Sequence, residues 1–455
     1  MNPFAVIWRS TSEARTQFRR HVAKPDETER HRDYIDSNKQ EGSVKFSAEF
    51  AERRFGYGLS PVIAPVTSLD TMLAGVTGPD MQSDRFPIED FETFRGRMMV
   101  ATAARKARKQ AQKDGDAEAA SRFTKECKVI NREARQAKAD WLLRTLLRRT
   151  YTEQAFYERL VAFWGDHFTA QGKAGVMRRG TSPYLETSIR PHVGGLFADL
   201  LIATVTSRLM LHYLDQERSM GPQSARAIKK AGQFGLNENL AREVIELHTL
   251  GVGGSYTQMD VRQLAELLTG LTYQIGKGTR FRKDFAEPGE EMILGNVYGP
   301  KPGMASIKKA LRDLAAHPAT ARHIAHKLAV HFVSDTPDPV LVQHIEQAYL
   351  RSDGNLTACY AALLEHPAAW QRDTMNMRPA LEFVSAAMRA LAIKPEPLLR
   401  HGEKQVAALF YGPLTLMGQR FQQPNGPDGW PEGRRGLDHA PGHRRAAGMG
   451  DECAA

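Results

Sequence analysis

Apolar residues recur every three or four positions along most of this chain, and that spacing predicts a mainly α-helical fold. The clearest amphipathic segments follow residue 150 and read TEQAFYERLVAFWGDHF, GGLFADLLIATV, TQMDVRQLAELLTG and PATARHIAHKLAVHFV. Strand-like segments do not alternate with helical ones, and neither a GxGxxG nor a P-loop motif is present. We therefore expect a multi-helix bundle without a site for a dinucleotide or a nucleoside triphosphate.

The same pattern divides the chain into one long folded part and two ends. Residues 1–46 are polar and lack sustained periodicity, which is typical of disorder or of a mis-assigned N-terminal extension with Val44 as an alternative start. Residues 47–430 are expected to form a single large helical domain. Residues 431–455 show no helical period. If suitable codons are chosen for this tail, the same bases read one position later encode an amphipathic helical ending. We interpret this tail as non-native and frame-shifted.

Two segments interrupt the regular bundle pattern. Residues 88–150 are rich in Ala, Arg, Lys and Gln, with a break at Asp114-Gly115-Asp116, which predicts a long basic helical hairpin that turns there. Residues 271–298 contain short β-rich stretches separated by GKG and EPG, which predict a small β-hairpin or an ordered loop.

Charge and composition narrow the function classes. The 455 residues carry a net charge of +10, and residues 101–150 alone hold fourteen lysines and arginines against six carboxylates. No aromatic residues lie among the charges from 101 to 121, so we expect a solvated helix pair and no specific nucleic-acid partner. The three cysteines form no CxxC motif, which argues against a zinc ribbon. No membrane span and no signal peptide are visible, which indicates a cytoplasmic protein, and no cofactor is predicted.

The stretch GLNENLAREVIELHTLG, residues 235–251, is dense in polar residues. On a helical wheel Glu238, Arg242 and Glu246 fall opposite the apolar side at i, i+4 spacing, which predicts an exposed ladder of ion pairs. Asn237 is the expected N-cap. Glu243 and His248 are left on partly buried positions, where a carboxylate needs a partner from another element.

Other segments supply the remaining candidates for a site. His167 lies in FWGDHF, and Arg190 and His192 lie in IRPHVGG. With Glu243 and His248 they are the candidate catalytic or ligand-binding residues, and all of them except Arg190 are also candidate metal ligands. His317, His323, His326 and His331 share one predicted helix, but their spacing puts them on several faces, so a common metal is not expected.

The order of the motifs FGYGLSP, ERLVAFWGDHFT, IRPHVGGLFADLL, GLNENLAREVIELHTLGVGGSYTQMDVRQLAELLTG and DGWPE resembles the bacterial domain of unknown function family numbered 1800. The match runs from about Phe46 to Trp430. The resemblance implies a large, mostly helical protein but no particular reaction. Members often lie beside genes for a usually exported sulfatase-like family, which implies a protein partner of that kind.

Two departures from the family pattern reduce the expectation of an enzyme. Gly165 stands where many members have a second His, as in FWHNHF. Ala286, Glu287 and Glu291 stand where many members have the His, Asp and Lys of an HDxGxK pattern.

Two functional hypotheses follow. The first is a helical scaffold or partner protein, which predicts that Glu243 and His248 are sealed in the core with structural partners and no pocket. The alternative is an enzyme or small-ligand binder with a polar His/Glu/Arg site in the helical core, which predicts that the five candidates converge around a cavity.

Overall fold

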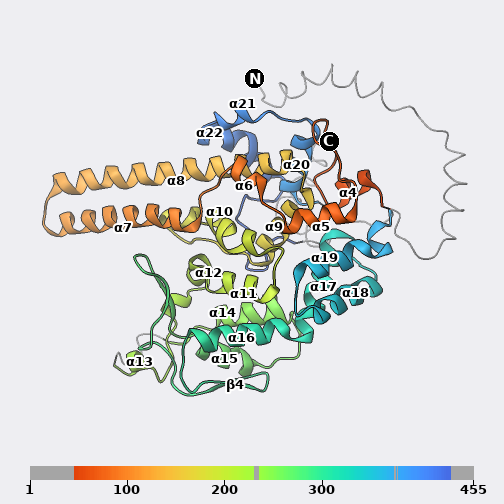
Figure 1. The fold of residues 1–455 in the computed structure, drawn as a ribbon. Coiled ribbons are helices and arrows are strands. Elements are labelled where there is room, and N and C mark those ends of the chain that lie inside the picture. Colours follow the sequence, from red (N-terminus) through yellow and green to blue (C-terminus); the bar gives the residue numbers. More distant parts are fainter. Residues whose placement is uncertain (1–45, 230–234, 373–375, 377, 432–455) are drawn as a thin grey trace, which may run out of the picture. The chain divides into compact units, whose positions relative to one another are not determined.

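The computed structural model describes residues 46–229, 235–372, 376 and 378–431. Over these residues the chain is mainly α-helical, with two small antiparallel sheets, as the periodicity predicts (Figure 1). The predicted N-terminal extension and C-terminal tail lie outside the described residues, except for their innermost positions. Within the described ranges, no helix is long and apolar enough to cross a membrane.

Three short helices open the described part, and each begins after a side chain that accepts a hydrogen bond from the first turn. Such a cap satisfies a backbone N–H that has no partner inside the helix. The helices are α4 (Ala48–Arg54), α5 (Leu69–Thr77) and α6 (Met81–Arg85), capped by Ser47, Ser68 and Asp80.

The predicted hairpin is formed by α7 (Phe91–Lys113) and α8 (Ala117–Tyr151), which project together from the other helices (Figure 1). The turn falls at the predicted DGD sequence. Gly115 adopts φ +71°, a left-handed conformation that glycine reaches without strain, and Asp116 caps α8 by accepting from the amide of Ala119 at 2.8 Å.

The end of α8 nearest the other helices is apolar and buried. Leu142, Leu143, Leu146 and Leu147 belong to a second hydrophobic cluster that also contains residues of the C-terminal helices. Those elements are α20 (Ala380–Ala390), α21 (Pro395–Leu399), α22 (Glu403–Val406), the π-helical turn η7 (Ala407–Tyr411) and α23 (Gly412–Leu416).

The larger core contains residues of α4, α5, α7 and α8 as well as of later elements. The elements between α8 and α20 contribute most of it. They are α9 (Ala155–His167), η1 (Gly175–Arg179), α10 (Thr181–Tyr184), η2 (Leu185–Ile189), η3 (Arg190–His192), α11 (Phe197–Val205), α12 (Arg208–Tyr213), η4 (Gln216–Arg218), α13 (Ala225–Lys229), α14 (Asn239–Glu243), η5 (Val244–Thr249), α15 (Gln258–Leu267), α16 (Met304–Ala316), α17 (Pro318–Phe332), α18 (Pro339–Arg351), α19 (Leu356–Glu365) and η6 (Pro367–Trp370). Among them, α13 has no buried residue.

The predicted β interruption contains two separate hairpins. Strand β1 (Leu271–Gln274) pairs antiparallel with β2 (Gly278–Phe281), and β3 (Glu291–Ile293) pairs with β4 (Asn296–Tyr298). The prediction of a hairpin in this segment is therefore correct, although it named one where there are two.

Helices α9 and α17 face each other through long side chains. Arg159 contacts His331 near one end, and the rings of His167 and His323 lie 6.1 Å apart near the other. The earlier residue of α9 contacts the later residue of α17, and the later residue of α9 lies by the earlier one of α17. The two helices therefore run antiparallel. This pairing positions both of the polar sites described below.

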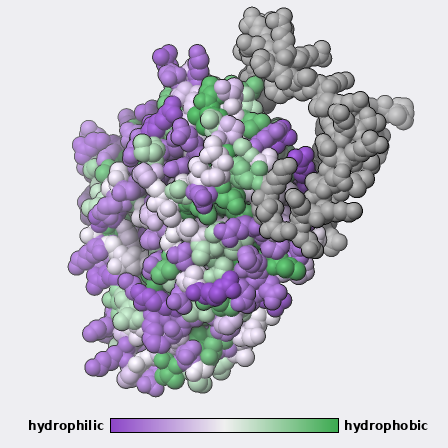
Figure 2. Space-filling view, turned by 45° about the vertical axis from the view of Figure 1, so that its right-hand side comes forward, coloured by the Kyte–Doolittle hydropathy of each residue, from purple (hydrophilic) through white to green (hydrophobic). Residues whose placement is uncertain are grey.

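The surface in Figure 2 is hydrophilic over most of its area, with hydrophobic residues scattered in small groups. Single exposed apolar side chains are normal on a soluble protein and need no partner to cover them. Exposed examples among the described residues are Val252, Val340, Phe383 and Leu416.

Candidate functional site

The predicted ion-pair ladder on the 235–251 stretch is confirmed. Arg242 lies 3.2 Å from Glu238 and 3.0 Å from Glu246, and all three side chains are partly exposed. The N-cap prediction is off by one residue, because the helix begins at Asn239 and its N-cap is Glu238. Asn237 still accepts a hydrogen bond, from the amide of Asn239 at 2.9 Å.

This stretch is not one regular α-helix, because it widens into a π-turn at η5. The amide of Leu250 donates to the carbonyl of Ile245 at 2.9 Å, which is the i to i+5 bond of a π-turn. The extra residue in the turn changes the directions predicted from a regular helix. His248 is fully buried, and Glu243 is partly exposed.

The structure brings His167 and His248 together. Their rings lie 5.8 Å apart, and Nε2 of His167 lies 3.2 Å from the carbonyl oxygen of His248. His323 completes a group of three, with Nε2 at 3.1 Å from the carbonyl oxygen of Leu247. The sequence placed the four histidines of the helix that contains His323 on several faces and did not group His323 with His167 and His248.

A cavity of about 820 Å³ adjoins this histidine cluster. His167, His323 and Lys327 line one side, and the glycine-rich loop that follows η5 lines another. Within the described structure, Nδ1 of His167 and both ring nitrogens of His248 are buried without a hydrogen-bond partner. Each buried polar atom without a hydrogen bond lowers the stability of the fold by about 1–3 kcal/mol. Packing alone therefore does not account for this cluster.

Both buried imidazoles are held in the neutral form. Burial lowers the pKa of His167 well below its usual range, and Lys327 and the neighbouring histidines add to the shift. Burial, then Lys327 and His323, lower the pKa of His248 to about 3. The described residues contain no group of three or more His, Cys, Asp or Glu side chains that could hold a metal. A nearby lysine also disfavours a cation.

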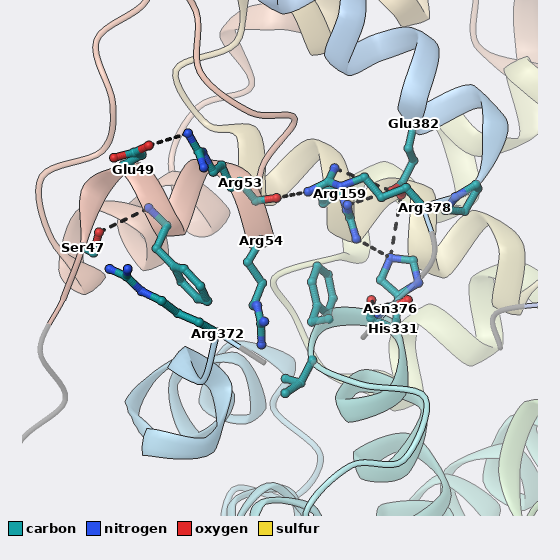
Figure 3. Close-up of a pocket in the computed structure, with 14 residues that line it drawn as sticks. Ser47, Glu49, Arg53, Arg54, Arg159, His331, Arg372, Asn376, Arg378 and Glu382 are labelled. Carbon is teal, nitrogen blue, oxygen red and sulfur yellow. Dashed lines mark hydrogen bonds and ion pairs between the residues drawn. The ribbon is translucent and has the colours of Figure 1, made fainter. Parts of the chain in front are cut away.

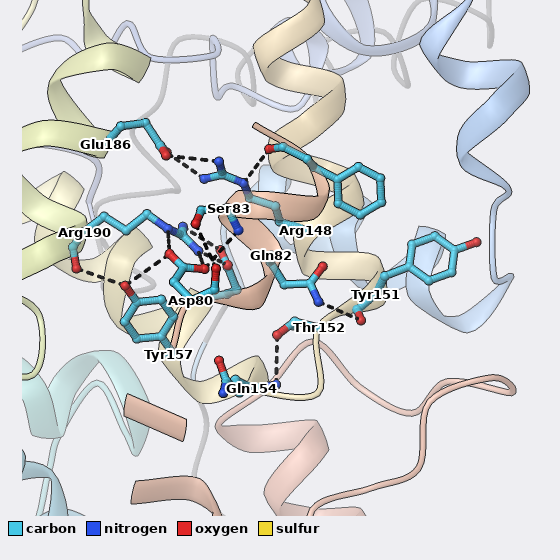
Figure 4. Close-up of polar contacts among 12 residues, drawn as sticks. Asp80, Gln82, Ser83, Arg148, Tyr151, Thr152, Gln154, Tyr157, Glu186 and Arg190 are labelled. Atoms are coloured by element: carbon cyan, nitrogen blue, oxygen red, sulfur yellow. Dashed lines mark hydrogen bonds and ion pairs between the residues drawn. The ribbon is translucent and has the colours of Figure 1, made fainter. Parts of the chain in front are cut away.

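Arg190 does not reach this cluster. Its guanidinium forms ion pairs with Glu158 and Asp80 and lies over the ring of Tyr157 (Figure 4). Burial alone would lower the pKa of Arg190, but the attraction of Glu158, Asp80 and Glu186 outweighs it and raises the pKa. Arg190 is a satisfied structural arginine.

Neither His192 nor Glu243 is among the described residues that line the cavity beside His167. Burial lowers the pKa of His192, and Asp199 opposes this shift. Burial, then Glu246 and Asp428, raise the pKa of Glu243 to about 7. The five candidates therefore do not all line one cavity: His167 lines the cavity of the histidine cluster, whereas Arg190 is held by Glu158 and Asp80.

None of the residues in the two departures from the family pattern lines the cavity of the histidine cluster. A Cβ atom on Gly165 would come within 2.7 Å of Cδ2 of Leu185, so Leu185 occupies the space that a side chain there would need. Glu291 is buried in the β interruption, and burial together with Glu266 and Glu287 raises its pKa to about 7.

A second polar site lies at the opposite end of the α9–α17 pair, and sequence reasoning missed it. Arg159, His331 and Glu382 form its floor (Figure 3). Nη1 of Arg159 lies 2.7 Å from Oε2 of Glu382, and Nη2 lies 3.2 Å from Nε2 of His331. Burial would raise the pKa of Glu382, but Arg159, His331 and Arg378 outweigh it and lower the pKa, so the carboxylate is ionised.

The walls of this arginine pocket come from segments far apart in the sequence. Arg54 donates to the carbonyls of Ala369 and Gln371, and Arg378 donates to the carbonyls of Gly56 and Arg53. Burial lowers the pKa of both guanidinium groups to about 10. The cavity has a volume of about 420 Å³, with Arg53 and Arg372 exposed among its lining residues.

One sequence signal could have pointed to this pocket. Arg159 lies between Phe156 and Phe163 on the apolar side of α9, and Glu382 lies in the apolar segment LEFVSAAM. A charged residue at a core position needs a partner of opposite charge, so these two were natural candidates to pair.

Comparison with known proteins gives the family and nothing more specific. No curated protein matches this chain. No solved structure matches it either. The family described as protein of unknown function (DUF1800) matches residues 51–438, which is most of the chain and includes α9, the 235–251 stretch, α17 and Glu382. This protein therefore belongs to the DUF1800 family, whose function is unknown.

Proposed function

We propose that this protein binds a small organic ligand through a carboxylate or a similar oxyanion in the arginine pocket. Arg159 carries the proposal. Its side chain is only 4% exposed and is ion-paired with Glu382 through Nη1, and its Nε makes no hydrogen bond within the described structure. A ligand carboxylate on the guanidinium edge would accept from such a donor.

The balance of charge supports an anionic ligand. The described residues that line the pocket include five arginines and two carboxylates. Each carboxylate is already engaged, Glu49 with Arg53 and Glu382 with Arg159. The remaining excess of positive charge in a partly enclosed site attracts anions.

The size and walls of the pocket favour an organic acid over a bare ion. Its volume of about 420 Å³ is in the range of small-molecule sites. Phe50 and Phe332 line it beside the arginines, so a ligand can place a carboxylate on the guanidinium groups and an apolar part against the rings.

Calorimetric titration with matched pairs of probes tests this function. Succinate and benzoate are compared with succinamide and benzamide, which have nearly the same shape but no charge. We expect the acids to bind about tenfold or more tightly than the amides, because charge-assisted hydrogen bonds contribute about 1.5–3 kcal/mol. Arg159→Lys keeps a positive charge beside Glu382 but removes the planar guanidinium, which can donate two parallel hydrogen bonds to a carboxylate. This variant should therefore bind the acids more weakly.

Two further variants separate the site from general charge effects. Arg372→Gln removes an exposed cation from the pocket lining and should weaken acid binding, whereas Arg262→Gln removes a cation that pairs with Glu266 elsewhere and should not. Circular dichroism checks that each variant is folded. Equal binding of acids and amides by the wild-type protein would overturn the proposal.

The histidine cluster supports a second candidate, in which His167 and His248 belong to a separate site for a polar ligand. Their unpartnered ring nitrogens beside a cavity support it. Of the five candidates from the sequence, only these two are brought together. Elemental analysis of the purified protein tests the alternative, that the cluster binds a metal. A stoichiometric metal in the wild type that is lost in His167→Ala would show a metal site and contradict a polar-ligand site.

The resemblance to the family also supports a separate proposal, that the protein acts as a helical scaffold for a sulfatase-like partner. This proposal rests on gene neighbourhood in the family. Co-expression with the neighbouring sulfatase-like protein and size-exclusion chromatography test it, and separate elution of the two chains would contradict it.

A further inference from the structure

A basic cleft lies where α8 of the hairpin meets η1 and the C-terminal segment, away from both sites described above. Arg135 and Lys138 of α8 line it together with Arg178, Arg179 and Arg420. Glu403 is the one carboxylate among the described lining residues, and it is already paired with Arg135 at 2.9 Å. The cleft encloses about 320 Å³, which is room for a small group and not for an extended chain.

Lys138 is the central residue of this cleft. Its ammonium group donates to the carbonyl of Phe421 at 3.4 Å and lies 5.5 Å from the centre of that ring. Within the described structure it forms no ion pair with a carboxylate. Burial and the adjacent charge of Arg179 lower the pKa of Lys138 to about 8, which shows that the charged form is poorly compensated here.

Two neighbouring guanidinium groups also form no ion pair with a carboxylate in the described part of the chain. Arg178 donates to the carbonyl of Lys173 and Arg179 to that of Gly175, both neutral acceptors. The hydroxyl of Tyr411 also lines the cleft, and it is buried with no hydrogen-bond partner among the described residues. A hydroxyl donor beside an ammonium and several guanidinium groups is the donor set that a tetrahedral oxyanion requires.

We propose that this cleft binds a phosphate or sulfate group, held by Lys138, Arg179 and the hydroxyl of Tyr411. Three donor types from three separate elements line one cleft of about 320 Å³, which has room for such a group. An ion there would compensate cations that the chain leaves without a carboxylate partner. The site is independent of the arginine pocket, so either proposal can fail without the other.

Calorimetric titration with inorganic phosphate and with glycerol 3-phosphate, at constant ionic strength set by chloride, tests the proposal. We expect the wild-type protein to bind at least one of them. Lys138→Met and Arg179→Gln should each lower the affinity roughly tenfold or more, since each removes a charge-assisted hydrogen bond. Arg132→Gln is the matched control, because Arg132 is exposed on the same helix and does not line the cleft.

The two probes distinguish the source of the group. Tighter binding of glycerol 3-phosphate indicates a phosphorylated organic ligand, and equal binding indicates the free ion; both support the site. Arg420→Gln, at an exposed lining residue, provides a variant that leaves the fold intact and should also weaken binding. The proposal is overturned if Lys138→Met and Arg179→Gln bind phosphate as the wild type does. It is also overturned if a short DNA duplex binds and neither phosphate probe does.

Discussion

Arg159 and Glu382 form an ion pair of 2.7 Å between side chains that are only 4% and 5% exposed. The two residues come from helices more than two hundred positions apart in the sequence, and they close the floor of the arginine pocket. A buried pair of this kind is costly to break from one side, because the remaining charge is left in a medium of low polarity.

Glu382→Gln is therefore expected to lower the free energy of unfolding by roughly 3–5 kcal/mol. Urea denaturation near neutral pH measures the effect. Glu49→Gln, which removes an exposed carboxylate from the rim of the same pocket, should change stability by less than about 1 kcal/mol. If both variants lose less than about 1 kcal/mol of stability, the pair of Arg159 and Glu382 behaves like an exposed ion pair and the prediction is wrong.

The pH dependence of stability gives a separate prediction for Glu382. Its pKa in the folded protein is lowered by Arg159, His331 and Arg378 acting against burial, relative to about 4.3 in an unfolded chain. The pair therefore contributes its full stability above the unfolded pKa and loses it as pH falls through the folded pKa. Unfolding curves between neutral and acidic pH should show a smaller acid sensitivity in Glu382→Gln than in the wild type.

His248→Phe should stabilise the protein or leave it unchanged near neutral pH. The substitution keeps a ring among Phe168 and His167 and removes two buried nitrogens that have no hydrogen-bond partner. Each such group costs about 1–3 kcal/mol. Thermal unfolding measures the change, and a marked loss of stability would show that His248 is fixed by an interaction such as a bound ligand.

The same variant should also alter the response to acid. The pKa of His248 is about 3 in the folded protein and about 6.5 in an unfolded chain, so the unfolded state binds the extra proton between these values. Stability is lost as pH falls through this window, and His248→Phe should reduce that loss. His326→Gln, at an exposed position on α17, should leave the pH profile unchanged.

Arg190→Met is expected to destabilise the fold by roughly 3–5 kcal/mol without changing ligand binding in the arginine pocket. The substitution leaves the buried Glu158 without the guanidinium that pairs with it, and it also removes the partner of Asp80. Urea denaturation and the succinate titration measure the two properties on one sample. Loss of succinate binding with unchanged stability would contradict this prediction and would show that Arg190 takes part in ligand binding.

Lys138→Met should raise stability at neutral pH, because it removes a partly buried charge that has no carboxylate partner within the described structure. The pKa of Lys138 is about 8 in the folded protein and about 10.4 when unfolded, so the unfolded chain holds the extra proton between these values. The free energy of unfolding of the wild type should therefore rise with pH across this window. The variant should show a smaller rise, as alkaline urea denaturation can establish.

Features set by neighbouring residues in the sequence could be predicted well. The DGD turn of the hairpin, and the ladder of Glu238, Arg242 and Glu246, depend on local spacing, and the structure has them where the pattern placed them. The π-turn at η5 could not be predicted, because a helical wheel assumes a constant rotation per residue.

The site was harder to predict, because its residues meet only in the tertiary fold. His167 and His248 were both candidates in the sequence, and their rings lie 5.8 Å apart, but Arg190 was also a candidate although it has two carboxylate partners of its own. Arg159, His331 and Glu382 belong to three segments with no shared motif. Their common feature in the sequence is a charged or polar residue on an apolar helix face, which predicts a buried partner but does not say which one.

A crystal structure of the protein grown with benzoate tests the central claim most directly. Our account predicts density for the ligand in the arginine pocket, with its carboxylate within about 3 Å of the guanidinium of Arg159 and its ring against Phe50 or Phe332. An empty arginine pocket in crystals that hold benzoate elsewhere, or a ligand whose carboxylate points away from Arg159, would contradict it.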